Sequence, residues 1–299
     1  MTYSIVARDA ETGEMGVAVQ SHFFTVGPIV PWLRAGVGAV ATQSFVEPAY
    51  GLRGLARMAY GEAAPEALEA LVADDESRDV RQVAMVDTHG RVGAYTGARC
   101  IKDAGHRVGE GFSVQANMMR NPTVPDAMYD AYVSTDAPLA ERLVAALVAA
   151  EEEGGDIRGR QSAAIKIVRA ESGGDPWNDI VLDLRVDDHP DPNTELGRLV
   201  HMHRGYARLG RSEELQVAGR ADEADAEATA ALALLPENIE IGFWRGVQLC
   251  VDGRDAEARP LLDRAFATDD GWRELVRRLP AAGLLADDAA LLARVLGSS

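Results

Sequence analysis

The sequence contains few residues of several kinds, and each scarcity excludes a class of chemistry. Among its 299 residues only Lys102 and Lys166 are lysines, so Schiff-base or lysine-nucleophile chemistry has just two candidates. The only cysteines are Cys100 and Cys250, which form neither a CxxC motif nor a zinc-ligand spacing. This sparse cysteine usage is typical of a protein in a reducing compartment.

No hydrophobic run is long enough to cross a bilayer. The most apolar stretch, residues 23–33, contains two prolines and is followed by Arg34. The opening residues 1–6 lack the basic segment of a signal peptide and lead directly into a strand pattern. We therefore expect a cytoplasmic protein with no membrane partner.

Basic residues are scarce relative to acidic ones. The chain has 47 Asp and Glu against 30 Lys and Arg, which gives a formal net charge of −17. A chain of this charge repels nucleic-acid phosphates and anionic lipid surfaces, and neither half of it is basic. We therefore expect no nucleic-acid partner. The hydrophobic content of 47% is ordinary for a globular protein with its own core.

Residues 1–188 are expected to form an α+β domain. Short strands and paired helices follow one another in the order ββ, β, αα, ββ, β, αα, ββ. This order differs from a regular βαβ alternation, and neither GxGxxG nor GxxxxGK[ST] occurs. It predicts layered sheets with helices outside. The expected strands are 4–7, 16–20, 36–43, 82–86, 91–95, 112–116, 163–168 and 181–186, and the expected helices begin near residues 50, 65, 125 and 138.

Residues 189–299 are expected to form a small all-helical domain. A linker rich in Asp and Pro, residues 187–193, precedes it. Gly219-Arg220 recurs as Gly253-Arg254 at an offset of 34 residues, with matching Glu and Ala positions. This period resembles tetratricopeptide repeats, of which about three are usually needed for an independent solenoid. We therefore expect the segment to dock on the first domain, to dimerise or to bind a protein partner.

Motifs of metal sites and of α/β-hydrolases are absent from the sequence. Its six histidines form no HExxH pair, and no GxSxG motif occurs. We therefore expect no metal and no cofactor. Thr2 is a candidate nucleophile, because removal of Met1 would leave its hydroxyl beside a free α-amine. Such an amine has an ordinary pKa of about 7.7–8.0 and can act as a base near neutral pH.

Several stretches together resemble the DUF1028 family of unknown function, over about residues 2–190. The resemblance implies an N-terminal-nucleophile hydrolase-like fold, a four-layer αββα sandwich, in agreement with the order of elements above. The stretches are YSIVARD (3–9), ETGEMGVAVQS (11–21), PWLRAGVGAVATQ (31–43), YG (50–51), GHRVGEG (105–111), GGDIRGRQSAA (154–164) and DLRVDDHP (183–190).

The resemblance implies a catalytic set at one end of the strands. By the logic of this fold, Thr2 attacks an amide carbonyl while its own amine relays the proton. Gln43 or Asn117, both at strand ends, would donate hydrogen bonds to the oxyanion. Asp156 and Ser162 lie in a loop between a helix and a strand, where they would orient the amine.

Further residues are candidates for substrate binding. Ser21 and Thr42 end strands that the αββα layout brings near the start of the first strand. Arg158 and Arg160 suit the carboxylate of a small anionic ligand. His106, between a glycine and an arginine, is a candidate general acid or base.

These observations predict a metal-independent hydrolase of C–N amide bonds in a small metabolite. Two alternatives stay open: a non-catalytic module that binds a small molecule or a protein, and an enzyme that uses an internal residue such as His106. The chain departs from proteasome-like sites because residues 36–44 contain no lysine and the nearby Arg34 cannot shuttle protons. A homodimer is expected from the layered sheets and the incomplete solenoid.

Overall fold

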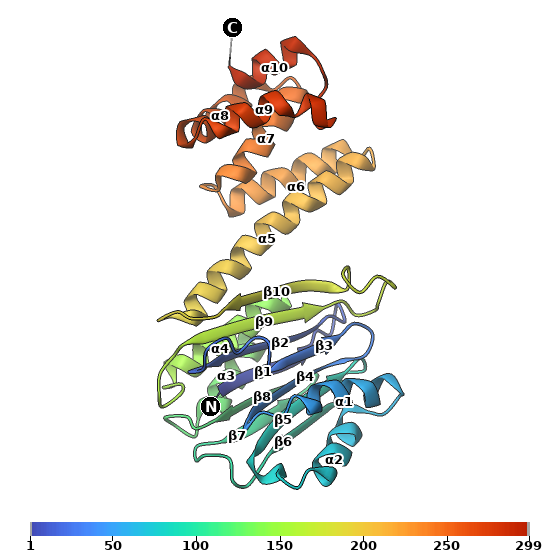
Figure 1. Ribbon diagram of the computed structural model, residues 1–299, viewed down its shortest axis with the longest axis vertical. Coiled ribbons are helices and arrows are strands. Elements are labelled where there is room, and N and C mark those ends of the chain that lie inside the picture. Colours follow the sequence, from blue (N-terminus) through green and yellow to red (C-terminus); the bar gives the residue numbers. More distant parts are fainter. Residues whose placement is uncertain (1, 298–299) are drawn as a thin grey trace. The chain divides into compact units, whose positions relative to one another are not determined.

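The computed structural model describes residues 2–297 and divides the chain into two compact units, residues 1–200 and 201–299. The first unit contains two antiparallel sheets and two pairs of helices, whereas the second is helical throughout (Figure 1). The expected α+β class, with an all-helical segment after the sheets, is confirmed. No helix within residues 2–297 has the length and apolar character that crossing a membrane requires.

Sheet A, the larger sheet, has the strand order β10-β9-β2-β1-β8-β7. Its register places Thr2 opposite Ser21 of β2 and opposite Asn117 of β8, and it places Ser21 opposite Ser162 of β9. The ends of four neighbouring strands therefore lie side by side at one end of the sheet. The strands are β1 (Thr2–Arg8), β2 (Met15–Ser21), β7 (Gly105–Gly109), β8 (Phe112–Asn117), β9 (Ser162–Val168) and β10 (Ile180–Val186).

Sheet B has the order β3-β4-β5-β6 and lies face to face with sheet A. Gln43, near the end of β4, is opposite Gln82, near the start of β5. These two residues are therefore adjacent at one end of the sheet. The strands are β3 (Pro31–Arg34), β4 (Gly38–Ser44), β5 (Arg81–Asp87) and β6 (Val92–Thr96), and a short 3-10 turn, Arg78–Val80, precedes β5.

Helices cover the outer face of each sheet, which gives four layers (Figure 1). α1 (Ala49–Ala59) and α2 (Ala64–Asp74) pack on sheet B, and α3 (Val124–Ser134) and α4 (Leu139–Glu152) pack on sheet A. Strand side chains alternate between two apolar clusters, as a period of two residues requires. Along β1, for example, Ile5 contributes to the cluster under α3 and α4, whereas Val6 contributes to the cluster between the sheets.

Two strands of the structure, β3 and β7, are missing from the sequence prediction. Both lie at sheet edges. β3 begins with Pro31, and β7 contains two glycines and the pair His106-Arg107. Edge strands tolerate proline, glycine and charge because one side of their backbone has no partner strand. Alternation of apolar residues is therefore a weak guide to them.

The division between the two units falls inside α5 (Pro192–Val217), twelve residues beyond the predicted boundary at 188/189. Leu196 and Val200 of this helix are buried in the same apolar cluster as α3 and α4. The core of the second unit is formed by α7 to α10. Its elements after α5 are α6 (Ala221–Leu234), α7 (Ile239–Val251), α8 (Asp255–Thr268), α9 (Gly271–Arg278), a 3-10 turn at Pro280–Ala282 and α10 (Ala289–Leu296).

The residues repeated at an offset of 34 have the same local structure. Gly219 has a φ of 73° and Gly253 a φ of 76°, a left-handed conformation that suits glycine. In each repeat the next residue is an arginine at the N-cap position of the following helix. Its side chain pairs with a glutamate three residues on, at 2.5 Å in the first repeat and 2.8 Å in the second. The motif therefore specifies a turn into a helix.

Candidate functional site

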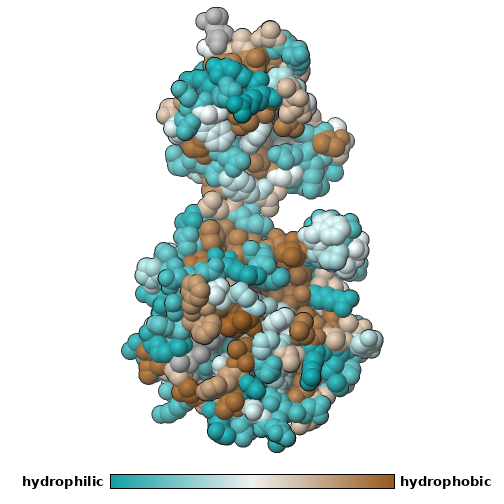
Figure 2. Space-filling view, viewed as in Figure 1, coloured by the Kyte–Doolittle hydropathy of each residue, from teal (hydrophilic) through white to brown (hydrophobic). Residues whose placement is uncertain are grey.

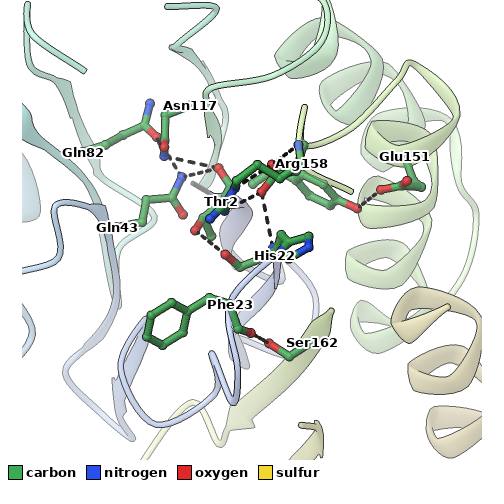
Figure 3. A network of polar contacts seen from close by, with 12 residues as sticks. Thr2, His22, Phe23, Gln43, Gln82, Asn117, Glu151, Arg158 and Ser162 are labelled. Atoms are coloured by element: carbon green, nitrogen blue, oxygen red, sulfur yellow. Dashed lines mark hydrogen bonds and ion pairs between the residues drawn. The ribbon is translucent and has the colours of Figure 1, made fainter. Parts of the chain in front are cut away.

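Thr2 begins β1, an interior strand of sheet A, and its residue is only 4% exposed. Its hydroxyl donates a hydrogen bond to the Ser21 hydroxyl at 3.0 Å. Its carbonyl oxygen accepts from Gln43 Nε2 at 3.2 Å and from Asn117 Nδ2 at 3.3 Å. Figure 3 shows these two amides pointing toward Thr2. The backbone and side chain of Thr2 are thus both held, by three different strands.

Gln82 is the centre of the polar network and was not predicted from the sequence. Its Oε1 accepts from Gln43 Nε2 and from Asn117 Nδ2, each at 2.8 Å (Figure 3). Its Nε2 donates across to sheet A, to the Ala116 carbonyl at 2.8 Å, and to the Thr96 hydroxyl at 3.0 Å. A buried glutamine at the start of a strand therefore fixes both amides that hold Thr2.

Hydrogen bonds extend this network into the space between the sheets. Ser4 donates to Gln43 Oε1 at 2.7 Å and accepts from Gln115 Nε2 at 2.6 Å. Ser113 in turn donates to Gln115 Oε1 at 3.0 Å. All four side chains are buried. Because buried polar groups need partners, this chain of bonds fixes the orientation of the Gln43 amide.

The predicted oxyanion donors are occupied by neighbouring groups. Both N–H groups of Asn117 Nδ2 are used, toward the Thr2 carbonyl and Gln82 Oε1. Gln43 Nε2 faces the same two acceptors and also the Gln115 carbonyl at 3.3 Å. In this arrangement the two amides position Thr2, and a donor role toward substrate would require one of them to exchange partners.

Asp156 lies beside the end of β2, next to the Thr2–Ser21 pair. The residue is 1% exposed, and its carboxylate accepts from the backbone N–H of His22 at 3.3 Å and binds the Arg158 guanidinium at 2.9 Å. An isolated backbone β-bridge between Asp156 and Met119 joins this loop to the segment after β8. The loop thus places a buried carboxylate and its paired cation at the end of the sheet where β1 begins.

Ser162 and Arg160 come from the same loop but contact other groups. The Ser162 hydroxyl donates to the Phe23 carbonyl at 2.6 Å and accepts from the Val26 N–H at 3.1 Å. These bonds hold the loop after β2, which begins beside Thr2. Arg160 pairs with Asp191 at 2.9 Å and with Glu151 at 3.4 Å.

Thr42 and His106 lie further from the Thr2 hydroxyl in the network. Thr42 is buried and donates to the Glu47 carbonyl at 3.2 Å, so its hydroxyl fixes the loop after β4. His106 Nδ1 lies 2.8 Å from the Thr96 hydroxyl, which also accepts from Gln82. The His106 residue is exposed, but partial desolvation of its ring lowers the pKa of His106, which favours the neutral form.

Tyr3, next to Thr2, points to the opposite face of sheet A. Its phenol donates to Glu151 at 2.8 Å and accepts from Asn193 Nδ2 at 2.8 Å. Burial and the Glu151 carboxylate raise the pKa of Tyr3 well above 10, so it remains protonated. Tyr3 therefore anchors β1 to α4 and α5.

Within residues 2–297 no three His, Cys, Asp or Glu side chains cluster as metal ligands would.

Comparisons with known proteins place the first unit in a family. A model for a family of unknown function, DUF1028, matches residues 2–196. A crystal structure of a protein from Silicibacter pomeroyi, described by the same family model, is similar with a TM-score of 0.59 and 30% identity. That similarity covers 67% of this chain and 87% of the other. No curated protein matched the sequence.

Proposed function

This chain belongs to the DUF1028 family, and we propose that it is a metal-independent hydrolase of C–N amide bonds in small metabolites, with Thr2 as the nucleophile. The observation that carries the proposal is the set of hydrogen bonds that holds Thr2 in place. Its hydroxyl is paired with Ser21, and its carbonyl is held by two amides from two other strands. Such positioning of a reactive group is what nucleophilic catalysis requires.

The proposed reaction has two steps. After removal of Met1, which lies outside the described residues, the free amine of Thr2 takes the proton of the Thr2 hydroxyl as its oxygen attacks the amide carbonyl. The protonated amine then gives that proton to the leaving nitrogen, the C–N bond breaks and an ester on Thr2 remains. Water hydrolyses the ester with the same amine as base, which releases the acid and restores Thr2.

The surrounding residues have distinct proposed roles. Ser21 orients the Thr2 hydroxyl, and Gln43 and Asn117 hold the Thr2 backbone. The Asp156–Arg158 pair supplies a buried carboxylate for the Thr2 amine together with a cation for an acidic substrate. Ser162 acts through the loop that it holds, and the side chain of Gln43 or Asn117 becomes an oxyanion donor only if it exchanges partners.

The test combines the mass of the intact protein with activity on a panel of small amides. We expect loss of the Met1 mass, release of amine from at least one amide and no activity in Thr2→Ala. Thr88→Ala, in the turn after β5, is the matched control and is expected to retain full activity. Thr2→Ser, which keeps a hydroxyl, is expected to retain part of it. Retention of Met1, or full activity of Thr2→Ala, would exclude the terminal nucleophile.

The internal-residue enzyme is a second candidate because His106 is joined to the same network through Thr96 and Gln82. It predicts that Thr2→Ala stays active while His106→Asn does not. A binding module without catalysis predicts that neither change affects turnover, since there is none. The cytoplasmic location, the homodimer and a protein partner for the helical segment stay predictions alongside these proposals.

A further inference from the structure

A pocket of about 440 Å³ lies along β3, β9 and α1 of the sheet unit, and none of the residues that line it belongs to the Thr2–Gln82 network. β3 ends sheet B and faces β2 and β9, while β10 extends sheet A by one more strand. Hydrophobic side chains gather over this part of the unit in Figure 2. The apolar wall is formed by Pro28, Pro31, Trp32, Leu33, Leu52 and Leu55. Its volume is that of a small-molecule site.

The side chains of this wall are closely packed and hydrogen-bonded without a ligand. The Trp32 indole N–H donates to the Ile29 carbonyl at 3.0 Å. Its ring lies so close to α1 that a Cβ on Gly51 would meet Trp32 Cγ at 2.1 Å. Across the pocket, the aliphatic part of Arg185 packs on Gly27, where a Cβ would meet Arg185 Cδ at 2.9 Å. A preformed wall of this kind reduces the entropy lost on binding.

Three cations line this apolar wall in a chain whose net charge is −17. Lys166 occupies a position on β9 whose neighbours on the same face, Ala164 and Val168, belong to the apolar cluster between the sheets. Lys166 and Arg185 share one carboxylate, Asp183, at 3.2 and 3.3 Å. The pocket therefore holds more positive than negative charge.

Arg34 supplies the remaining positive charge. It is exposed at the end of β3, and among residues 2–297 its guanidinium has no ion-pair partner. Lys166 and Arg185 remain 24% and 40% exposed, so both can still reach a ligand. A cation placed beside an indole ring and aliphatic side chains matches an anion that carries an apolar body.

From these observations we propose that this pocket binds a small organic monocarboxylate with an aromatic or aliphatic body. The carboxylate pairs with Arg34 and Lys166, and the apolar body lies against Trp32 and Leu52. The site is distinct from the Thr2 network, because Lys166 is opposite Val17, four residues along β2 from Ser21. At about 3.3 Å per residue this places Lys166 about 13 Å along the strand from Ser21.

The experiment uses 1-naphthylacetate as the probe and 1-naphthylacetamide, its neutral analogue, as the reference. Calorimetric titration of the full chain gives the affinities, and the indole N–H resonance of Trp32, assigned with Trp32→Phe, locates the probe. We expect the carboxylate to bind at least about tenfold more tightly than the amide, since a charge-assisted bond replaces a neutral one. The Trp32 resonance should shift during the titration.

Matched variants separate the pocket from general electrostatics. Lys166→Met and Arg34→Ala are each expected to weaken carboxylate binding by about tenfold, whereas Lys102→Met, which removes the other lysine, leaves it unchanged. Arg34→Ala alters an exposed side chain, so it reports on binding even if Lys166→Met disturbs the fold. Thr2→Ala is expected to bind the probe normally. Equal affinity for the two probes, equal effects of the two lysine variants or no binding at about 1 mM would each overturn the proposal.

Discussion

Replacement of Gln82 by methionine tests the buried network most directly. Gln82 is fully buried, and its Oε1 is the acceptor for one N–H of Gln43 and one N–H of Asn117. Methionine has a similar volume but no acceptor for these amides, so two buried N–H groups lose their partner. At about 1–3 kcal/mol for each, we expect Gln82→Met to lower the free energy of unfolding by about 2–6 kcal/mol.

Gln20 provides a control of the same residue type and the same burial. It is also fully buried, yet among the described residues neither its Nε2 nor its Oε1 has a hydrogen-bond partner. An apolar side chain of similar size there removes an uncompensated desolvation cost. We therefore expect Gln20→Met to leave stability unchanged or to raise it by up to about 2 kcal/mol.

Urea titration read by hydrogen–deuterium exchange of peptides from β5 and β8 follows the sheet unit separately from the helical unit. The reasoning requires Gln82→Met to unfold at lower urea than wild type and Gln20→Met to unfold at the same or higher urea. Equal losses in the two variants would refute it, because burial alone, rather than hydrogen bonding, would then set the cost. Under the proposed hydrolase, Gln82→Met also lowers kcat, since the amides that hold Thr2 lose their common acceptor.

Three further predictions follow from other parts of the sheet unit and from α5. Burial alone would raise the pKa of Asp87, but hydrogen bonds from three backbone N–H groups and a guanidinium lower it. Its stabilising effect is therefore complete above its ordinary pKa of about 3.9 and is lost as pH falls through the folded value. Asp87→Asn should cost about 2–4 kcal/mol in urea unfolding at pH 7 and less at pH 3. Gly51→Ala should destabilise the protein by about 1–3 kcal/mol, because the added Cβ would meet Trp32. Gly210→Ala, in open space on α5, should stabilise the protein by up to about 1 kcal/mol. Thermal melting of the two variants compares these effects. Partial desolvation lowers the pKa of His106. The stabilisation that the neutral ring gives the folded state is therefore present above about pH 6.5 and is lost as pH falls through the folded pKa. The melting temperature of His106→Asn should depend less on pH between about 7 and 5 than that of the wild type.

Sequence patterns predicted the layers better than the contacts of the site. Short apolar runs located the interior strands, since each of these strands buries one face against helices and the other against the second sheet. Such runs could not reveal which strand ends meet. That depends on the antiparallel register, which places Thr2 opposite both Ser21 and Asn117. Family resemblance supplied the expectation that these ends share one edge.

The sequence does not reveal the role of Gln82 in the site, because little in its local pattern distinguishes it. It is one polar residue at the start of an apolar strand, a position usual for a solvent-exposed side chain. Ser162 illustrates the opposite difficulty, because its type and place suggested that it orients the Thr2 amine. Its hydroxyl instead bonds the backbone at Phe23 and Val26. A hydroxyl or amide becomes specific only through its tertiary partners, which local patterns do not contain.

The two proposed sites make a joint prediction about energetic independence. Ser21, which contacts Thr2, and Val17, which is opposite Lys166, lie on one strand about 13 Å apart. Changes at that separation without shared partners usually add to within about 0.5 kcal/mol. Calorimetry with 1-naphthylacetate on Thr2→Ala, Lys166→Met and the double variant should therefore give additive binding free energies. A coupling above about 1 kcal/mol would mean that β2 transmits the state of the anion pocket to Thr2, and the pocket would then be a regulatory site of the proposed hydrolase.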